Sequence, residues 1–458
     1  MKQAVTSLVL SYLRFFAKRA LSLHKPIIIG ITGSIGKSST RNAISAILKD
    51  HYPTKVVWGN SETGIPLGIL GIHQTGFGPF DWFLMLCKVP FGLGYIKGIR
   101  YLIVEMSIDE PYAPKNMEYL LTILRPHIAL FLNVTAMHTM QFEKLLREKR
   151  FSHVTKEEQL RFLVQKIAEE KAKAITESNC EIGIYNADDS YIIASLRAFI
   201  QKNSKTHLLS FGKNKNNTIM YDKYESDLSS TKFTFLLRPE DKKYTIDIIF
   251  NYFVLPKEYQ EVFAPAILVG YTLGISALRI ATSLEKHFTL PKSRASLFKG
   301  INQTVIIDSS YNSPKQAVLA FLSHAKELKQ KTGKPLVFLF GDMRELGEAA
   351  KEAHEEVAKK IAGVVDYLYC VGPLTMEYVL PEVEKHNNSL KEIRWFASAK
   401  HVGEYLKNHL PYNTIVLVKG SQNTIFLEEA IKYILADKED VKRLCRQESF
   451  WMKKKGSF

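Results

Sequence analysis

A lysine and two serines after a glycine-rich stretch are the residues whose types and spacing most directly suggest chemistry. Residues 27–40 read IIIGITGSIGKSST, a strand-like run of isoleucines, then recurring glycines, then Lys37, Ser38 and Ser39. Glycines let backbone N–H groups approach phosphate oxygens, and a helix that starts here adds a favourable dipole. In such a loop Lys37 would reach the β- and γ-phosphates of a nucleotide and Ser38 would hold Mg²⁺. The stretch therefore predicts a phosphate-binding loop.

The general pattern of such loops is G-x-x-x-x-G-K-[ST], and it would require a glycine where Ile31 stands. A glycine-rich turn with a solvated lysine is the alternative interpretation. It is less favoured, because G-K-S-S closely follows a buried-strand pattern and precedes a helical one. The residues that we expect to surround the phosphates are Gly33, Ser34, Gly36, Lys37, Ser38 and Ser39.

Polar residues also follow two other stretches that read as buried strands. Glu105 lies at the end of the strand predicted at 101–106, and Asn133 and His138 lie in the loop after the strand at 128–132. Ligands bind outside the carboxyl ends of strands in open α/β sheets, so these side chains would face a common crevice. Glu105 is a candidate Mg²⁺ ligand or else a solvated acid. His138 is a candidate for metal binding or nucleotide contact, or else a structural histidine.

The segments that follow alternate between helix and strand patterns. A strongly charged stretch at 143–177 reads as a helix, and a strand at 182–185 leads into the polar cluster NADD. Residues 204–255 alternate apolar and polar side chains, which is typical of antiparallel strands. A helix rich in small and apolar residues is predicted at about 260–284.

A second α/β region follows a linker near residues 290–293. Its predicted strands, which alternate with helices, lie at 304–312, 335–347, 366–371 and 414–418. This alternation predicts a doubly wound sheet. We therefore expect an N-terminal helix at 1–25, a central ATP-binding domain with a mostly parallel sheet at 26–289, and a C-terminal Rossmann-like domain at 290–458. The basic stretch RQESFWMKKKGSF at the end is expected to be a surface tail.

The composition limits the classes of protein to consider. The 458 residues suffice for two or three domains, and the formal net charge is +16. Such a charge suits polyanionic substrates or an anionic membrane surface. No zinc-finger spacing, RNA-binding aromatic signature or long arginine-rich run is present in the sequence, so nucleic-acid binding is not favoured. The four cysteines lie far apart without metal-ligand spacing, which indicates a reducing, cytoplasmic setting.

Two apolar segments are candidates for contact with a membrane surface. Residues 1–24 have the pattern of an amphipathic helix that is too short and too interrupted to span a bilayer. This helix would pack against the ATP-binding domain or lie on a membrane. Residues 80–98 are aromatic and apolar with few charges, so they would form a buried helical hairpin or a membrane-touching flap. For this second segment we favour burial.

Taken in order, these stretches resemble the Mur ligase family, and within it the type that adds D-alanyl-D-alanine to a peptidoglycan precursor. GITGSIGKSS resembles the phosphate loop of the family, NSETGIPLGILG its N-x-E-x-G-x-P-L segment, VEMS its Mg²⁺-binding strand end and NVTAMH its N-[IV]-x-x-x-H loop. IAEEKAKAI resembles the segment whose lysine is carbamylated in relatives, which would be Lys171. NADD, IDSSYNSPKQA, FGDMRELGEAAKEAHEEV and VKGSQNTIFLEEAI complete the series. The resemblance covers nearly the entire chain from Ile27.

The resemblance implies functions for individual residues. Lys37, His138 and Lys171 would be catalytic. One Mg²⁺ would bind Ser38 and Glu105, and a second would bind near His138 and carbamylated Lys171. The residues that would reach ATP from the C-terminal domain are Arg294, Asp308, Tyr311 and Asn312, and those near the amino-acid-binding end are Lys419 and Ser421.

The sequence departs from the family pattern in three places, one of which is the stretch between His138 and Lys171. Members of the family carry a UDP-binding domain before the phosphate loop, whereas this sequence places only a short segment ahead of Gly30. We therefore expect that domain to be missing. The H-N-x-x-N segment of the family near the adenine appears here as Tyr259, Gln260 and Phe263. Contacts to the base would thus differ from those of the family.

The implied reaction is ATP-dependent formation of an amide bond through an acyl phosphate, which would join D-Ala-D-Ala to a UDP-MurNAc-tripeptide. ATP and Mg²⁺ would be the cofactors and small molecules the substrates. We expect a monomer in the cytoplasm, with possible contact to the inner face of the membrane. One alternative is a folylpolyglutamate or cyanophycin-type ligase of the same superfamily. Another is a catalytically weak ATP-binding scaffold of cell-wall synthesis.

Overall fold

The computed structural model describes residues 2–73, 78–136, 139–147, 154–202, 205–239, 242–251, 254–344, 346–386, 390–421 and 424–455. The predicted site residue His138 lies outside these described residues.

The chain forms two compact units. Unit 1 consists of Met1–Lys223, Thr234–Ile248 and Gln260–Phe288, and unit 2 of Tyr224–Phe233, Ile249–Tyr259 and Thr289–Phe458. The two units alternate along residues 224–259, so the domain bounds expected from the sequence, 1–25, 26–289 and 290–458, stay predictions.

A nine-stranded sheet has the strand order β2-β3-β1-β4-β5-β6-β7-β8-β9. Its strands are β1 (Ile27–Thr32), β2 (Thr54–Val56), β3 (Tyr101–Glu105), β4 (Ile128–Phe131), β5 (Ile182–Asn186), β6 (His207–Gly212), β7 (Ile219–Ser226), β8 (Ser230–Leu237) and β9 (Tyr244–Asn251). From β2 to β7 the neighbouring strands pair in parallel, with β1 between β3 and β4. The carboxyl ends of β1, β3 and β4 therefore lie side by side, as predicted.

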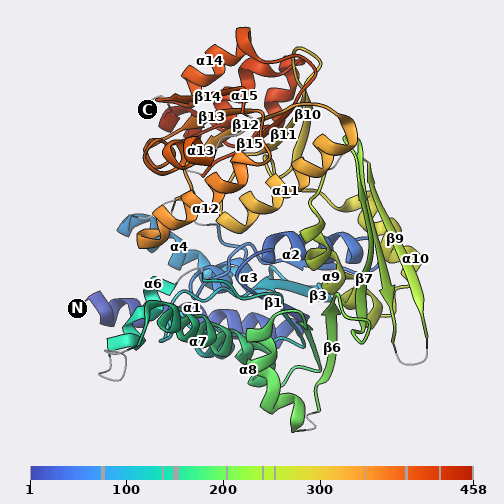
Figure 1. Cartoon of the computed structure of the whole chain (residues 1–458). Coiled ribbons are helices and arrows are strands. Elements are labelled where there is room, and N and C mark those ends of the chain that lie inside the picture. The colour runs from blue at the N-terminus through green and yellow to red at the C-terminus, as the bar shows by residue number, and fades with distance from the viewer. Residues whose placement is uncertain are drawn as a thin grey trace. The chain divides into compact units, whose positions relative to one another are not determined.

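Helices cover both faces of the parallel part of this sheet (Figure 1). Helix α2 packs against α9 and α10, and α7 packs against α5 and α8. The helices are α1 (Lys2–His24), α2 (Lys37–Leu48), α3 (Gly64–Ile69), α4 (Pro79–Lys88), η1 (Val89–Gly94), α5 (Met117–Ile123), α6 (Thr139–Phe142), η2 (Glu143–Arg147), α7 (Lys156–Thr176), α8 (Ser190–Gln201), η4 (Lys257–Tyr259), α9 (Gln260–Thr272) and α10 (Ala277–His287).

Local chemistry explains where several of these helices begin and end. Thr155 and Glu158 form a capping box that starts α7, which is the main part of the helix predicted at 143–177. The single helix predicted at 260–284 is two helices, α9 and α10. Gly274 takes a positive φ of 81° between them, and the Ser276 hydroxyl then caps α10.

The alternating stretch at 204–255 forms β6 to β9, and β7 to β9 build a ribbon at one edge of the sheet. In β9 every second residue is buried, which matches the alternation in the sequence. The β7–β8 pair is closed by hydrogen bonds from the Asp227 N–H to the Ser230 carbonyl (3.0 Å) and from the Arg238 N–H to the Thr218 carbonyl (2.7 Å). This is the register of an antiparallel hairpin, as predicted for this stretch. The prediction was wrong for β6, which pairs in parallel with β5 and with β7.

Unit 2 contains a six-stranded sheet of order β10-β11-β15-β12-β13-β14. The strands are β10 (Ser296–Lys299), β11 (Val305–Ser309), β12 (Leu336–Gly341), β13 (Tyr367–Val371), β14 (Glu392–Phe396) and β15 (Ile415–Lys419). All neighbours pair in parallel except β10 with β11. The four predicted strands correspond to β11, β12, β13 and β15, so the α/β class and the doubly wound arrangement are confirmed. Strands β10 and β14 were not predicted.

The helices of unit 2 are α11 (Lys315–Thr332), η5 (Gly347–Ala349), α12 (Ala350–Ala362), η6 (Thr375–Val379), α13 (Leu380–His386), α14 (Ala399–His409), α15 (Glu428–Ile434), η7 (Lys438–Arg443) and α16 (Ser449–Lys455). Helices α14 and α15 share a core with the strands of this sheet, in which Val416, Val418 and Leu427 are buried.

The two apolar segments of unit 1 are only partly buried. In α1 the side chains of Leu13, Ala17 and Ala20 are buried in the core of unit 1, whereas Leu8 and Phe15 are exposed. The hairpin predicted to be buried at 80–98 is α4 followed by η1. Its inner residues, among them Met85 and Val89, are buried, but Phe80, Phe83 and Phe91 are exposed, so burial of the whole hairpin was wrong. None of the helices in the described part of the chain is long and apolar enough to cross a membrane.

The expectation of a surface tail at the C-terminus holds for Glu448, Ser449, Met452 and Lys453, which are exposed, but it was wrong for Arg446 at the start of that tail. Leu444, Cys445 and Arg446 are buried, and α16 follows them. Arg446 forms a buried ion pair with Glu428 of α15, with a separation of 2.6 Å between Nη2 and Oε2. The Lys455 ammonium lies 2.8 Å from the other oxygen of the same carboxylate. Arg446 was expected to be solvated, but the buried carboxylate of Glu428 on another helix holds it in the core.

Candidate active site

The turn between β1 and α2 has the geometry of an anion-binding loop. Gly36 precedes α2 with φ of 86°, a left-handed conformation that favours glycine. No side chain caps the start of α2, so its first N–H groups are directed at the loop without a side-chain acceptor. A Cβ atom at Gly33 would lie 3.0 Å from Cβ of Leu132, which shows how closely this turn approaches the end of β4. The sequence and the turn together provide amide donors for a phosphate group.

The side chain of Lys37 forms hydrogen bonds with the backbone of the loop. Its Nζ donates to the carbonyl oxygens of Gly33 at 2.7 Å and Ser34 at 3.3 Å. Burial lowers the pKa of Lys37, and the negative charges of Glu105 and Asp109 oppose that effect. The ammonium group therefore lies at the predicted phosphate loop, and its contact with phosphates stays a prediction.

The structure brings together Ser38 and Glu105, the two residues expected to bind one Mg²⁺. The Ser38 hydroxyl donates to Oε2 of Glu105 at 3.2 Å, and the carboxylate is buried at the end of β3. Hydroxyl and carboxylate oxygens are donors that Mg²⁺ accepts, so this pair fits the ion. The sequence analysis missed Arg41, whose Nη1 lies 2.8 Å from Oε1 of Glu105. Its position one turn along α2 from Ser38 could have suggested this contact.

Asn133 fixes the shape of the loop from the neighbouring strand. Its Oδ1 accepts hydrogen bonds from the N–H groups of Ser34 (3.1 Å) and Ile35 (2.8 Å), and its Nδ2 donates to the Ile35 carbonyl (3.1 Å). The Ser34 hydroxyl in turn accepts from the Thr135 N–H at 3.0 Å. Ser39 is buried in the first turn of α2. Ser34 thus supports the loop, and Asn133 has a positioning function that the sequence alone did not show.

Lys171 reaches the same loop from α7. Its side chain is buried, and Nζ donates to the Gly33 carbonyl at 3.0 Å. Burial lowers the pKa of Lys171 well below its usual value, and the positive charge of Lys37 lowers it further. The predicted lysine therefore does lie beside the phosphate loop. The amine of Lys171 contains no oxygen atom. Without carbamylation, Lys171 therefore supplies no oxygen ligand to the second predicted Mg²⁺.

The polar cluster after β5 organises loops rather than facing the phosphate loop. Asp189 caps α8 and accepts from the Val134 N–H at 2.8 Å through Oδ2. Asp188 accepts from the Lys213 N–H at 2.9 Å. Asn186 accepts from the Asp188 N–H at 2.9 Å. Of these, Asp189 links its helix to the segment that carries Asn133.

Tyr259, Gln260 and Phe263, which stand where the family has its segment near the adenine, lie in two different elements. Tyr259 ends η4, and Gln260 begins α9. Phe263 is fully buried, with its ring centroid 5.0 Å from that of Phe288. Phe263 therefore serves the core of unit 1, and its ring face is not available to stack on a base.

In unit 2 the predicted nucleotide residues lie together after β11. Asp308 is buried, and its Oδ1 accepts from the Ser310 N–H at 2.9 Å, while no described group bonds its Oδ2. Burial raises the pKa of Asp308. The Arg294 guanidinium carbon lies 4.7 Å from the ring centroid of Tyr311. Nε of Arg294 has no partner among the described groups, so both charged residues keep an unused polar atom.

Lys419, at the end of β15, joins this cluster. Its Nζ donates to the carbonyl of Asn312 at 2.9 Å and to the hydroxyl of Ser309 at 3.2 Å. Burial, and after it the positive charge of Arg294, lowers the pKa of Lys419 to about 7. Ser421 lies further along the same loop, where its hydroxyl accepts from the Arg344 N–H at 2.9 Å. Arg294, Asp308, Tyr311, Asn312 and Lys419 therefore form one cluster within unit 2.

A buried acid at the end of β12 was missed. Asp342 accepts from the Thr375 N–H at 2.9 Å through Oδ1, and its Oδ2 has no partner among the described groups. Burial raises the pKa of Asp342. The next residue, Met343, donates its N–H to Nε2 of His354 at 3.0 Å, so this histidine supports the loop after β12. The GDM sequence after an apolar strand was the available signal.

Two family models match the chain. The Mur ligase middle domain matches residues 31–147, and the Mur ligase glutamate ligase domain matches residues 293–422. Together these matches cover more than half of the chain. The first includes the phosphate loop and Glu105, and the second includes Arg294, Asp308 and Lys419.

Individual proteins agree with these matches. The UDP-N-acetylmuramoyl-tripeptide–D-alanyl-D-alanine ligase of Borreliella burgdorferi is 25% identical over 402 residues, which are 86% of this chain and 72% of that protein. The crystal structure of MurF ligase from Thermotoga maritima in complex with ADP has a TM-score of 0.66 at 21% identity, covering 93% of this chain and 83% of that one. A mutant of L. casei FPGS has a TM-score of 0.59 at 15% identity, covering 92% of this chain and 93% of that one. With both of its family domains matched, the chain belongs to the Mur ligase family.

Proposed function

We propose that this protein is an ATP-dependent ligase that joins D-alanyl-D-alanine to a UDP-N-acetylmuramoyl-tripeptide in the synthesis of peptidoglycan precursors. The named substrates come from relatives such as the Borreliella burgdorferi ligase. The observation that carries the proposal is the convergence on one loop of Lys37, Lys171 and the Ser38–Glu105 pair. Phosphoryl transfer requires positioning and charge neutralisation, and these groups supply both.

In the first step an oxygen of the substrate carboxylate would form a bond to the γ-phosphorus of ATP. The bond from that phosphorus to the bridging oxygen breaks, which gives an acyl phosphate and ADP. The free N–H groups at the start of α2 would bind the phosphate oxygens. Lys37 would exchange its bonds to the Gly33 and Ser34 carbonyls for bonds to the phosphates. Mg²⁺ held by Ser38 and Glu105 would neutralise part of the negative charge on the phosphates.

In the second step the amine of D-Ala-D-Ala would attack the acyl carbon. The tetrahedral intermediate expels phosphate and loses a proton from nitrogen, which leaves an amide. The groups that would reach the nucleotide from unit 2 are Arg294, Asp308, Tyr311 and Asn312, with Lys419 and Ser421 toward the amino-acid end. The support for these assignments is that Arg294 and Asp308 are buried or half-buried and keep polar atoms without described partners.

Lys171 would act as a carbamate. Its amine nitrogen would attack the carbon of CO₂ and release a proton, which requires the neutral form. Burial and the nearby Lys37 lower the pKa of Lys171 and so favour that form. The carbamate would add the oxygen donors that the amine lacks. His138, the other proposed ligand, lies outside the described residues, and its function stays a prediction.

The folylpolyglutamate or cyanophycin-type ligase remains the first alternative. The L. casei FPGS variant is covered over 93% of its length, more than the 83% of the Thermotoga maritima MurF structure. The MurF structure has the higher TM-score, 0.66 against 0.59. The scaffold alternative is disfavoured by the well-formed arrangement of Lys37, Ser38 and Glu105.

The test is phosphate release from ATP by the full chain. We expect release only when both the UDP-muramoyl-tripeptide and D-Ala-D-Ala are present, together with a product heavier by the dipeptide residue in mass spectrometry. Release with folate and glutamate would instead assign the chain to the folate branch. ATP binding without turnover on any substrate pair would assign it to the scaffold class.

Other expectations stay predictions from the sequence. These are a monomeric state, a cytoplasmic location, no nucleic-acid partner, and contact of residues 1–24 or 80–98 with the inner face of the membrane. Exposure of Phe80, Phe83 and Phe91 is compatible with the last of these. Gel filtration of the pure protein would test the first.

A further inference from the structure

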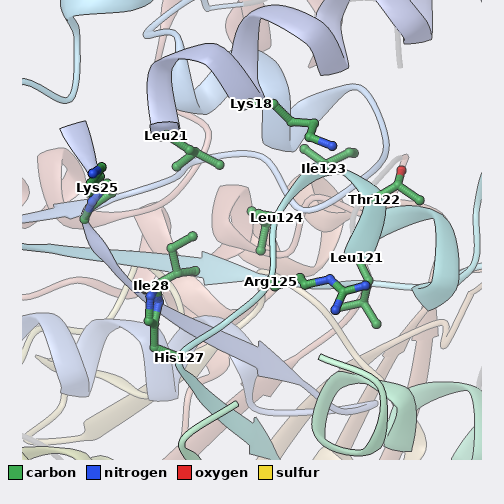
Figure 2. A pocket seen from close by; sticks show the side chains of 11 residues that line it. Lys18, Leu21, Lys25, Ile28, Leu121, Thr122, Ile123, Leu124, Arg125 and His127 are labelled. Atoms are coloured by element: carbon green, nitrogen blue, oxygen red, sulfur yellow. Dashed lines mark hydrogen bonds between the residues drawn. The ribbon is translucent and has the colours of Figure 1, made fainter. Parts of the chain in front are cut away.

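Unit 1 contains a cavity of about 450 Å³ whose lining includes none of the predicted site residues. Its walls come from α1 and the turn after it, from the last turn of α5, and from the segment between α5 and β4 (Figure 2). The cavity borders Pro26 and Ile28, at the amino end of β1, whereas the phosphate loop follows its carboxyl end. A strand of this length separates the two places by about 20 Å. The cavity is therefore a different site from the phosphate loop.

The polar side chains that line the cavity are all cations or hydrogen-bonding groups without negative charge. They are Lys18, Lys25, Thr122, Arg125 and His127, and the lining includes no aspartate or glutamate. In the part of the chain that the structure describes, the side chains of Lys18, Lys25 and Arg125 have no hydrogen-bond or ion-pair partner. Three cations that share a concave surface without an internal counter-charge repel one another, so an anion would stabilise them.

Two further contacts define the chemistry of the lining. Nδ1 of His127 accepts a hydrogen bond from the Ile28 N–H at 3.0 Å, so the ring proton of the neutral form lies on Nε2 as a donor. The Thr122 hydroxyl accepts from Nη1 of Arg14 at 3.2 Å, which brings a fourth cation to the rim. The N–H of Glu181 donates to the His127 carbonyl at 2.9 Å, but the side chain of Glu181 is not part of the lining.

The backbone places one of these cations at a conformational cost. Lys25 directly follows α1 and has a positive φ of 47°, in the left-handed region where glycine is usual. Buried apolar side chains, among them Ile28, Leu121 and Leu124, form the floor. The site thus combines a cationic rim with an apolar floor, which suits a ligand with a phosphate group and an apolar part.

We propose that this cavity binds the phosphate or diphosphate group of an amphipathic ligand. Lys18, Lys25 and Arg125 would neutralise the oxygens and His127 would donate through Nε2. The same chemistry is presented by a free phosphorylated molecule and by the headgroup of an anionic lipid. If the ligand is a lipid headgroup, Leu8 and Phe15 would contact the lipid surface. Both are exposed on α1, the helix that carries Lys18.

The first experiment is a calorimetric titration of the full chain with inorganic pyrophosphate. It is done in the Lys37→Ala background, so that the phosphate loop contributes little. The variant is Lys18→Gln/Arg125→Gln, and the matched control is Lys49→Gln/Lys215→Gln, which removes the same charge from exposed positions elsewhere. We expect the affinity for pyrophosphate to fall about tenfold or more in the first variant and to stay unchanged in the control.

A second experiment separates the two sources of phosphate. The full chain is sedimented with vesicles of pure phosphatidylglycerol or pure phosphatidylcholine. Binding to the first alone, lost in Lys18→Gln/Arg125→Gln, assigns the site to a lipid headgroup. Pyrophosphate binding without vesicle binding assigns it to a free phosphorylated molecule. The proposal is overturned if neither pyrophosphate nor phosphatidylglycerol binding depends on Lys18 and Arg125 while circular dichroism shows that the variant is folded.

Discussion

Lys37 and Lys171 donate hydrogen bonds to the same carbonyl oxygen, that of Gly33, at 2.7 Å and 3.0 Å. Two ammonium groups on one acceptor repel each other, and this repulsion, added to burial, lowers the pKa of Lys171. Lys37 follows the turn to which it is hydrogen-bonded, whereas Lys171 comes from α7, far along the sequence. The pair links the loop that would bind phosphates to the helix that would supply a carbamate.

Replacing Lys37 by alanine should abolish the proposed turnover while the protein stays folded. The side chain supplies one of the two ammonium groups that donate to the Gly33 carbonyl, so we expect a loss of roughly 10²–10³-fold in kcat. The measurement is phosphate release under saturating ATP, with circular dichroism to establish folding. Lys49→Ala, which removes an exposed lysine after the same helix, is the control and should keep full activity. An active Lys37→Ala protein would disprove the phosphate function of this residue.

Activity should depend on dissolved CO₂ if Lys171 is carbamylated. The lowered pKa of Lys171 makes its neutral amine available to CO₂ at a lower pH than for an ordinary lysine. We expect activity to fall in CO₂-depleted buffer and to return on addition of bicarbonate. Labelling with ¹³C-bicarbonate should give a carbamate signal in NMR spectra.

The Lys171→Met variant should lack both the carbamate signal and the CO₂ response. Lys166→Met provides the control on the same helix, because Lys166 pairs with Glu169 at the surface. A wild-type protein that is indifferent to CO₂ and shows no carbamate signal would contradict the proposal.

The buried pair of Arg446 and Glu428 should be important for the stability of unit 2. Arg446→Met leaves the Glu428 carboxylate with Lys455 as its other cation. Removing one partner of a buried ion pair costs about 3–5 kcal/mol, and Lys455 should keep the loss near the lower end. The change in the free energy of unfolding is measured in urea, with hydrogen exchange of peptides from β11 and β15 as the readout for unit 2.

Two comparisons sharpen this test. The double variant Arg446→Met/Glu428→Leu should be more stable than Arg446→Met, because no carboxylate is left buried without its guanidinium. Lys442→Met removes a surface lysine paired with Glu439 and should change little. Equal losses in the single and double variants would show that the pair is not the cause.

Lys419 should make the stability of unit 2 depend on pH. Its pKa is about 7 in the folded protein, against 10.5 ordinarily. Between these values the unfolded chain binds more protons than the folded one, so the free energy of unfolding rises with pH through this window. Below pH 7 the buried amine is charged in both states, and that gain is absent. In Lys419→Met the rise should be smaller, as urea unfolding at several pH values would measure. An identical slope in the two proteins would contradict the lowered pKa.

Local patterns in the sequence determined the elements that make the candidate site. The isoleucine run, the glycine spacing and G-K-S-S predicted β1, the turn at Gly36 and α2, because neighbours along the chain decide strand and helix formation. Strand ends predicted the place of Glu105 for the same reason. The resemblance to Mur ligases then added Lys171 and the residues of unit 2.

Only the tertiary structure decided which distant groups meet. The contact of Lys171 with Gly33 depends on how α7 packs on the sheet, and the amide of Asn133 reaches Ser34 because β4 pairs with β1. The burial of Arg446 was unpredictable, since a basic segment is usually solvated unless a carboxylate elsewhere in the core pairs with it. The cationic cavity near Arg125 likewise exists only where α1 lies beside the segment before β4. Side-chain pairing across the fold is a property of packing, and periodicity along the chain does not contain it.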